Sequence, residues 1–583
     1  MGKYLKSIKP SEWLMVIFSV VFVVGQVWLD LTLPDYMSEI TTLVQTQGST
    51  IGEILRAGGL MLLCALGSAG LSVIVGYFAA KISATISMRL RDDVYSKVSS
   101  FGAKEIKKFS TASLITRSTN DVRQVGMVVA FGLQVMIKAP ILAVWAIVKI
   151  LGKSWQWSVA TLIAVVILIL MLIIVTLFVM PKFKKIQDQT DTLNRVTRES
   201  LMGLRVIHAF NAEKYQEDKF ENANANLTKT QLFTQRVMSI VGPTMTLVMN
   251  GLNLSIYIIG AFLINAAGTV EKLTLFSDMV VFSSYAMQVV MAFMMIAMIF
   301  FMLPRAVVSA KRIGEVLKTE PEIKEGTFDG TTQQTGTVEF RDVCFKYPDA
   351  SEYVLKDISF KVNKGETVAF IGSTGSGKST LINLVPRFYD ATSGEILVDG
   401  VDVKDYKLEK LYDKLGYVSQ KAVMFHGTIK SNVSLGKANG QTPDDKSVEK
   451  AIEIAKASEF VNAKKDGVNS PITQGGTNVS GGQKQRLSIA RALARKPEIL
   501  IFDDSFSALD YKTDRELREN LKTNLADTTC LIVAQRIGTI SNADKIIVLD
   551  EGKMVGQGTH KELLENCPVY KQIALSQLSK EEL

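Results

Sequence analysis

Six apolar runs of about twenty residues or more constrain this chain more than any other feature of its sequence. A helical run of this length crosses roughly 30 Å of hydrocarbon, because each residue adds about 1.5 Å. The clearest run contains VATLIAVVILILMLIIVTLFVM, which has no charged residue. These runs predict an all-helical polytopic membrane domain surrounded by lipid bilayer, with spans at 13–33, 55–80, 125–151, 155–180, 239–266 and 276–303.

The first run has an alternative reading as a cleaved signal peptide, because Lys3, Lys6 and Lys9 precede it. A signal peptide needs a short apolar region that ends at a small-residue cleavage site. The run lacks such a site, and five further spans follow it. The sequence therefore favours an uncleaved first span.

The distribution of charge indicates how the chain faces the membrane. The 66 basic and 57 acidic residues leave +9, which in a soluble protein would suggest a nucleic acid partner. Up to residue 325, however, 32 basic and 22 acidic residues occur, so the excess lies in the apolar half. Segment 81–123 holds nine basic residues and segment 182–236 holds ten, whereas the alternate loops, 34–54 and 267–275, hold only Lys272.

Basic loops stay on the cytoplasmic side of a membrane. Both termini and the two basic segments are therefore predicted to be cytoplasmic, and the segments are expected to continue the spans as helices. No nucleic acid partner is expected. The compact chain, with no transit segment, favours a bacterial plasma (inner) membrane.

The last span contains many methionine and aromatic residues. Flexible, polarizable methionine suits a surface that accepts ligands of many shapes. The candidate wall of a substrate cavity consists of Phe282, Met287, Met291, Met295 and Met298. The alternative is that these residues face lipid or neighbouring helices.

Two ionisable residues, Lys138 and Asp278, fall within predicted spans. Such residues are expensive in a membrane and often functional. Both could instead lie near an interface, with the long lysine reaching toward water.

The composition changes after residue 320. Residues 321–335 are polar and rich in Gly and Thr, which is typical of a linker. Short β-branched runs then alternate with helical stretches, a pattern that predicts an α/β domain. The predicted division is a membrane domain at 1–320, the linker, and an α/β P-loop NTPase domain at 336–583.

A phosphate-binding loop is the strongest motif of the second half. A predicted strand at 367–371 leads into GSTGSGKS and then into helical sequence. Backbone N–H groups of such a loop surround the phosphates, while Lys378 reaches the β- and γ-phosphates and Ser379 binds Mg²⁺. A second apolar strand ends in Asp503, a carboxylate that would complete the Mg²⁺ shell. ATP and Mg²⁺ are therefore the predicted cofactors, with candidate ATP-binding residues Gly372, Ser373, Thr374, Gly375, Ser376, Gly377, Lys378, Ser379 and Thr380.

The sequence SGGQ, followed by helical QRLSIARALAR, lies between these two motifs. With its spacing and the fused spans, the chain resembles ATP-binding cassette (ABC) half-transporters of the exporter type, over nearly its whole length. The resemblance implies that Tyr347 stacks on adenine, that Gln420 is the Q-loop glutamine at the metal and that Asp510 belongs to the D-loop. It also implies two cytoplasmic coupling turns, at 111–121 and 199–213. The signature residues would complete the ATP site of a second chain: Ser480, Gly481, Gly482 and Gln483.

Two positions depart from the family's catalytic pattern. Asp504 stands where the family has a glutamate that acts on the attacking water, and Gln535 stands where it has a switch histidine. The shorter carboxylate is retracted by roughly 1.5 Å, and a misplacement of about 1 Å can cost on the order of 100-fold in rate. Glutamine cannot carry the charge of an imidazolium. The catalytic candidates are thus Asp504, Gln535 and Gln420, in a site that binds Mg-ATP and hydrolyses it slowly or not at all.

The resemblance thus implies one half of a heterodimeric exporter. Its partner would be a second half-transporter chain with an intact glutamate and histidine. The expected function is ATP-driven export of small amphipathic molecules, multidrug or lipid-like. The alternatives are a homodimeric lipid or peptide exporter and an ATP-gated regulatory membrane protein.

Overall fold

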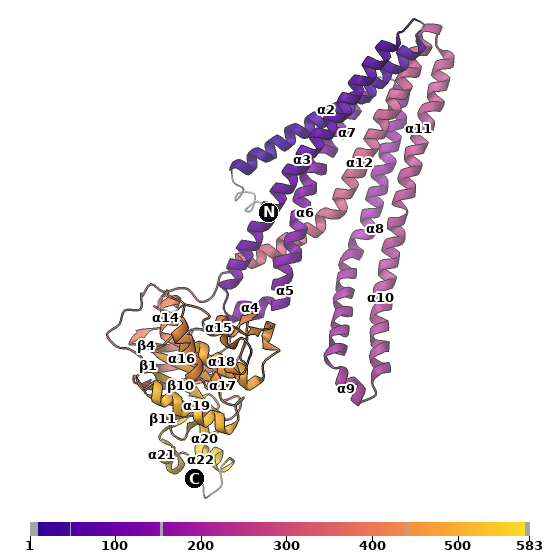
Figure 1. Cartoon of the computed structure of the whole chain (residues 1–583). Helices are drawn as coiled ribbons and strands as arrows, with labels where there is room; N and C mark the ends of the chain where they lie inside the picture. The colour runs from indigo at the N-terminus through magenta and orange to yellow at the C-terminus, as the bar shows by residue number, and fades with distance from the viewer. Residues whose placement is uncertain (1–9, 47, 152–154, 438–439, 578–583) are drawn as a thin grey trace. The chain divides into compact units, whose positions relative to one another are not determined.

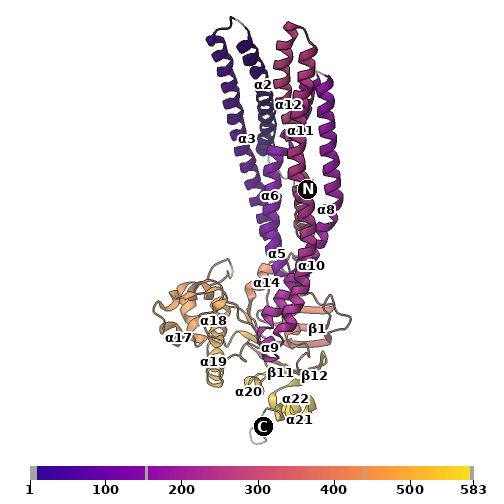
Figure 2. The ribbon, with the colours of Figure 1, turned by 90° about the vertical axis from the view of Figure 1, so that its right-hand side faces the viewer.

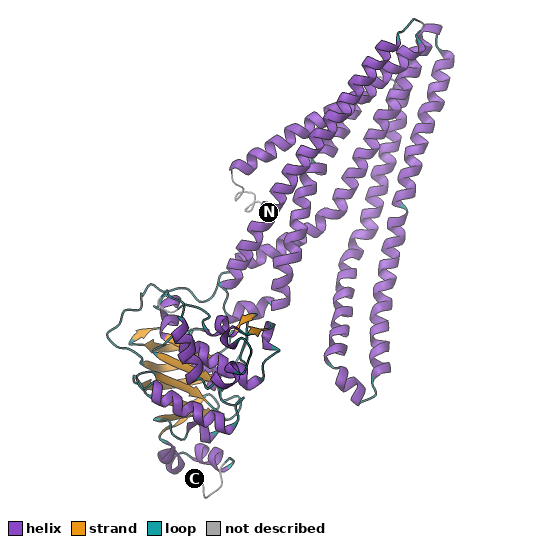
Figure 3. Cartoon of the chain, in the orientation of Figure 1, coloured by secondary structure: helices purple, strands orange, loops and turns teal. Residues whose placement is uncertain are grey.

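The computed structural model describes residues 10–46, 48–151, 155–437 and 440–577 (Figure 1). It divides into two compact units: Met1–Ser99 with Thr111–Thr319, and Ser100–Ser110 with Glu320–Leu583. Within the described residues, the first unit is helical and every strand lies in the second (Figure 3). These observations confirm the predicted fold class, a helical membrane domain followed by an α/β domain.

The first unit is built from long helices. Among the described residues, six helical stretches are long and apolar enough to cross a membrane, which confirms the six predicted spans. Its elements in chain order are α2 (Pro10–Gln45), α3 (Ile51–Ser99), α5 (Thr111–Thr116), η1 (Arg117–Asp121), α6 (Val122–Phe131), η2 (Gly132–Met136), α7 (Lys138–Leu151), α8 (Trp155–Met202), α9 (Leu204–Ala209), α10 (Glu213–Ser239), α11 (Val241–Ala266) and α12 (Thr269–Lys318).

The basic segments continue the spans as helices. Helix α3 runs unbroken for 49 residues and α8 for 48, so each begins in an apolar run and ends in a polar, basic segment. Helices α8 and α10 lie side by side, and the short helix α9 joins their ends (Figure 1, Figure 2). The second basic segment is therefore an extended helical hairpin.

The third span, predicted at 125–151, lies within one helical stretch, Thr111–Leu151, whose geometry is locally irregular. Two π-helical turns, η1 and η2, flank the ten-residue helix α6. Such turns are rare and occur mostly where a helix must readjust its packing. Residues on either side of α6 therefore face directions that helical periodicity does not predict.

The chain reverses direction earlier than the proposed coupling turn at 111–121. Those residues are helical, in α5 and η1, and the reversal occurs at Ser100–Ser110, around helix α4 (Ala103–Phe109). The physical reason is the backbone of Ser110, whose φ of 59° ends the helix. Buried Glu105 fixes this segment in the second unit by accepting hydrogen bonds from the N–H groups of Gly102 at 2.9 Å and Glu322 at 3.3 Å.

The second unit contains three sheets. The six-stranded sheet has the order β12-β11-β3-β10-β9-β6, in which only β12 is antiparallel to its neighbour. An antiparallel sheet has the order β2-β1-β4-β5, and β7 pairs with β8. The strands are β1 (Val338–Phe345), β2 (Leu355–Val362), β3 (Thr367–Gly372), β4 (Ser393–Val398), β5 (Val401–Asp402), β6 (Leu415–Val418), β7 (Gly427–Thr428), β8 (Pro471–Ile472), β9 (Ile499–Asp503), β10 (Thr529–Val533), β11 (Lys545–Asp550) and β12 (Lys553–Gly558).

The parallel strands form the centre of this unit because they are apolar on both faces. All residues of β9 and β10 are buried, as expected for parallel strands covered by helices on both sides. The helices are α13 (Lys378–Leu384), α14 (Leu408–Lys414), α15 (Ile429–Val433), α16 (Asp445–Ile454), α17 (Ser458–Asn462), α18 (Gly481–Ala494), α19 (Tyr511–Asn524), α20 (Ile537–Ile540), α21 (His560–Asn566) and α22 (Pro568–Leu575). The carboxyl ends of β3, β9 and β10 meet at one edge, where ligands bind in such folds.

Candidate functional site

A cavity of about 260 Å³ opens at the carboxyl ends of these strands. It combines residues from the phosphate loop with residues that follow β6, β9 and β10, far apart in the sequence. Its lining residues are Val354, Thr374, Gly375, Gly377, Lys378, Ser379, Thr380, Gln420, Asp504, Val533 and Gln535. The cavity is large enough for a polyphosphate chain with a metal ion.

The phosphate loop takes a shape that requires glycine. Gly377, the residue before α13, has a φ of 95°, and a Cβ there would lie 2.7 Å from Leu355. The ammonium group of Lys378 donates to the carbonyl oxygens of Gly372 at 2.9 Å and Ser373 at 2.7 Å. Burial lowers the pKa of Lys378, while the negative charge of Asp504 opposes this shift. A phosphate would stabilise the charged form of the lysine that burial disfavours.

A hydroxyl and a carboxylate lie together at the start of α13. Ser379 Oγ donates to Asp503 Oδ1 at 2.6 Å. Burial raises the pKa of Asp503, and the hydrogen bond from Ser379 partly opposes this shift. Oxygen ligands of this kind are those that Mg²⁺ prefers, and a cation would relieve the cost of the buried carboxylate. Ser379 and Asp503 therefore fit a metal ion beside the phosphate loop.

Asp504 lies at the centre of a cluster of amides. The same carboxylate oxygen, Oδ2, accepts from Gln535 Nε2 at 2.8 Å and from Gln420 Nε2 at 3.2 Å. The backbone of Asp504 has a φ of 47°, and its N–H donates to the carbonyl of Val533 at 3.1 Å. The structure thus brings together the three catalytic candidates, and Asp504 is held by its backbone as well as by both side-chain amides.

Tyr347 lies at the other side of the phosphate loop. Its hydroxyl is 2.9 Å from Thr380 Oγ1, and its ring packs edge-on against Phe345 and Tyr389. Tyr347 does not line the cavity around the phosphate loop. The half-buried ring thus lies beside α13, the helix that follows the phosphate loop.

The signature residues do not contribute to this cavity. Ser480 is the N-cap of α18, where its hydroxyl accepts from Gln483 N and the Gln483 amide oxygen accepts from Ser480 N, at 3.3 and 3.1 Å. This capping box is a structural role that the sequence analysis missed, although the spacing of Ser and Gln indicates it. Gly481 and Gly482 leave the helix start without side chains. No residue of 480–483 is among the described residues that line the cavity.

Asp510 likewise caps a helix. Its carboxylate accepts from Thr513 N at 2.9 Å and from Thr513 Oγ1 at 2.7 Å, at the start of α19. These hydrogen bonds lower the pKa of Asp510. The D-loop candidate therefore remains ionised and fixed in position.

The candidate substrate wall on α12 separates into buried and exposed residues. Phe282 is fully buried, with its ring centre 5.3 Å from that of Trp157, so it belongs to the core of the membrane unit and lines no open surface. Met287 and Met295 are half-buried. Met291 and Met298 are exposed, at 44% and 55%, and with Met294 they form one stripe along the helix.

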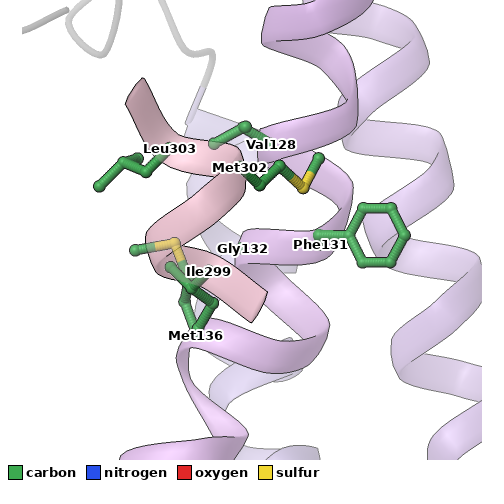
Figure 4. Close-up of a pocket in the computed structure, with 7 residues that line it drawn as sticks. All are labelled: Val128, Phe131, Gly132, Met136, Ile299, Met302 and Leu303. Carbon is green, nitrogen blue, oxygen red and sulfur yellow. The ribbon is translucent and has the colours of Figure 1, made fainter. Parts of the chain in front are cut away.

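A small apolar cleft lies beside this stripe, where α12 crosses η2 (Figure 4). All six side chains there are apolar, since Gly132 has none, and the ring of Phe131 turns away from α12. The cavity volume is about 10 Å³, close to the minimum for one water molecule, so the cleft holds no substrate in this conformation. Its lining residues are Val128, Phe131, Gly132, Met136, Ile299, Met302 and Leu303.

Lys138 has a partner that the sequence analysis did not identify. Its ammonium group lies 3.0 Å from Asp30 Oδ2, and Ser68 donates to the other oxygen of Asp30. Gln288 Nε2 donates to the backbone carbonyl of Asp30 at 3.1 Å. Four helices, α2, α3, α7 and α12, therefore meet at one ion pair. Asp278 lies half-buried on α12.

Comparison with known proteins gives consistent matches over both units. The family described as "ABC transporter transmembrane region" matches residues 16–303, and the family described as "ABC transporter" matches residues 355–507. An uncharacterized ABC transporter ATP-binding protein of Mycobacterium tuberculosis is 37% identical over 559 residues, which cover 94% of this chain and 93% of that protein.

Two further proteins are similar to this chain, one named for its activity and one of solved structure. An ATP-dependent lipid A-core flippase of Pseudomonas fluorescens is 32% identical over 89% of this chain and 85% of its own length. A solved bacterial Atm1-family ABC exporter with ATP bound matches with a TM-score of 0.82 at 23% identity, covering 97% of this chain and 98% of the other. At this identity, the similarity to the solved exporter shows the fold alone.

Proposed function

The chain belongs to the ABC transporter family, as an exporter half-transporter with one membrane domain and one cassette, and we propose that it works in a heterodimer whose ATP site on this chain is degenerate. This site would bind Mg-ATP and hydrolyse it slowly. The geometry of Asp504 carries the proposal, because the residue that should act on water is both short and engaged by two amides.

The binding elements support the first half of this proposal. Lys378 and Ser379 line the cavity, and Asp503 accepts a hydrogen bond from Ser379, so the site holds a cation for a triphosphate and oxygen ligands for Mg²⁺. In contrast, Asp504 Oδ2 already accepts two hydrogen bonds, and Gln535 cannot accept a proton from water or carry a charge. Nucleotide binding and nucleotide hydrolysis therefore separate at this site.

The need for a second chain rests on the signature residues. Ser480 and the two glycines form an open helix N-terminus, which suits the terminal phosphate of an ATP molecule. Because residues 480–483 do not line this chain's own cavity, we infer that they complete the site of a partner. A partner with an intact glutamate and histidine would then supply most of the hydrolysis.

Helix α9 supplies a second surface for that partner. Met202 is 83% exposed and Phe210 is 77% exposed, at either end of α9. The apolar run of α8 ends near Met180, so Met202 lies roughly 33 Å farther along the helix and beyond the hydrocarbon that the run spans. We propose that the partner's cassette covers this exposed apolar surface, on the cytoplasmic side that the basic loops indicate.

The proposed substrate is a small amphipathic molecule, multidrug or lipid-like, moved across the bacterial plasma membrane. The exposed stripe of Met291, Met294 and Met298 supports it, because methionine adapts to apolar ligands of different shape. The name of the related Pseudomonas fluorescens flippase points to lipid transport in that protein. ATP binding and hydrolysis would drive the export.

Expression of the chain alone and beside a candidate partner tests the proposal. We expect the solitary chain to hydrolyse ATP slowly in membranes and the pair to be at least about tenfold faster, since each interaction worth about 1.4 kcal/mol in the transition state contributes tenfold. The control is Lys378→Ala in the solitary chain, which separates its own activity from contaminants. Robust turnover by the solitary chain that Lys378→Ala abolishes would contradict the heterodimer.

The proposed adenine contact of Tyr347 makes a second prediction. Tyr347→Ala should weaken ATP binding about tenfold, since stacking of one base on an aromatic ring contributes about 1–3 kcal/mol. Tyr347→Phe should bind normally, because it keeps the ring and loses only the contact with Thr380. Displacement of a fluorescent nucleotide from the full-length protein measures both, with Tyr353→Ala, an exposed tyrosine nearby, as the matched control. Normal binding by Tyr347→Ala would exclude the contact.

A further inference from the structure

We infer that Gln577, two residues beyond the end of α22, is a positioning residue that holds Gln535 in place at the ATP site. The inference rests on the proposed function, in which Gln535 engages Asp504 at the ATP site. Gln577 is the last described residue of the cassette, and it belongs to no motif that is connected with ATP binding.

The contact is a pair of hydrogen bonds to one short piece of backbone. Gln577 Nε2 donates to the carbonyl oxygen of Gln535 at 2.7 Å, and Gln577 Oε1 accepts from the N–H of Ile537 at 2.8 Å. Ile537 is the first residue of α20, and the first N–H groups of a helix have no partner within it. One side-chain amide therefore satisfies both backbone groups around Arg536.

An amide side chain suits this pair of contacts. The segment presents one acceptor and one donor, and a glutamine or asparagine side chain has one of each at a fixed separation. A carboxylate could accept from Ile537 but would face the carbonyl of Gln535 without a proton to donate. The chemistry of residue 577 is thus matched to the backbone that it contacts.

Gln577 lies just beyond a firmly packed helix, α22. Tyr570 and Ala574 of α22 are fully buried, and α22 contacts β3 and β11 of the central sheet. The hydroxyl of Tyr570 also lies 2.7 Å from His560 Nδ1 in the preceding helix. Since the phosphate loop follows β3 directly, Gln577 ties the Gln535 segment to the same sheet that positions the phosphates.

The consequence reaches Asp504 through Gln535. The backbone of Gln535 is held by Gln577, and its side chain donates to Asp504 Oδ2 at 2.8 Å. When the backbone contact is lost, the side-chain amide has a wider range of positions. The distance between Gln535 and Asp504 then becomes variable, while the phosphate loop is untouched.

Hydrogen exchange on the full-length protein in lipid nanodiscs tests the contact itself. Gln577→Met has similar length but neither donor nor acceptor, so the amide proton of Ile537 should exchange about fivefold faster, the factor that one net hydrogen bond contributes. Gln577→Glu retains the acceptor and should keep Ile537 protected. Gln572→Met and Gln572→Glu, on the exposed face of α22, are the matched controls and should leave the exchange unchanged.

Single-turnover ATP hydrolysis by the same proteins tests the positioning role. Both Gln577→Met and Gln577→Glu should raise the turnover about threefold to tenfold, because both lose the contact with the Gln535 carbonyl and so loosen the amide that engages Asp504. The ATP concentration for half-saturation should stay the same, because Lys378 and Tyr347 do not touch Gln577. A merely structural effect would instead move half-saturation and melting temperature together.

Two results would overturn the inference. One is exchange and turnover in Gln577→Met equal to those of Gln572→Met. The other is a slower turnover accompanied by a matching loss of ATP affinity and thermal stability. The exchange measurement needs neither ATP nor a partner chain, so its outcome is independent of whether the heterodimer is correct.

Discussion

Asp504→Glu combined with Gln535→His is expected to raise ATP hydrolysis at this chain's own phosphate loop by on the order of 100-fold. The longer side chain extends the carboxylate by roughly 1.5 Å toward the place of the attacking water. The imidazole removes the amide that now holds Asp504 Oδ2 at 2.8 Å and adds a group able to carry charge beside the terminal phosphate. Both changes act on the same oxygen, so their effects should exceed the sum of the two single changes.

Each single substitution should give less. In Asp504→Glu, the Gln535 amide remains in reach of the carboxylate and continues to direct it away from water. In Gln535→His, the short carboxylate stays retracted, and its backbone conformation, with a φ of 47°, keeps it there. Asp504→Asn is the matched control, because it retains the size of Asp504 and removes the charge.

The measurement must separate this site from the partner's. In the proposed heterodimer, Ser480→Arg in this chain places a bulky cation at the signature that would serve the partner, so the partner's site should stop turning over. The remaining hydrolysis then reports this chain's phosphate loop alone. If the double substitution in this background leaves hydrolysis at the level of Asp504→Asn, the degenerate-site explanation is wrong.

The features that could be predicted from the sequence depend on residues that are adjacent in the chain. The six spans follow from apolar length, and the phosphate loop follows from glycines and a lysine within eight consecutive positions. The buried strand β9 was predicted because parallel strands covered on both faces are continuously apolar.

The features that the sequence missed depend on how distant elements pack. Helical periodicity did not show that Phe282 would be buried against Trp157, since any face of a membrane helix can be apolar. The chain reversal was assigned to 111–121, although the φ of Ser110 and the buried Glu105 place it at α4. Gln577 carries no motif, and only the crossing of α22 over the sheet brings it to Gln535.

The ion pair between Asp30 and Lys138 is another contact between elements that are distant in the sequence. Of the substitutions proposed for this chain, those that break this pair should lower stability most. Asp30→Leu leaves the Lys138 ammonium, whose side chain is only 17% exposed, without its carboxylate. Loss of one partner of a buried pair destabilises a protein by about 3–5 kcal/mol. The melting temperature of the full-length protein in nanodiscs should therefore fall clearly below that of the parent chain.

The double substitution Asp30→Leu with Lys138→Met should recover most of this loss, because two apolar side chains remove both the attraction and the cost of burying charge. The pair Asp35 and Lys149, 2.7 Å apart on the same two helices, is the matched control. Its side chains are about twice as exposed, at 42% and 38%, so breaking it should cost less. A double substitution at 30 and 138 no more stable than Asp30→Leu alone would show that the hydrogen bond from Ser68 to the carboxylate, rather than the paired charges, accounts for the loss, since the Gln288 bond to the Asp30 backbone is kept in every variant.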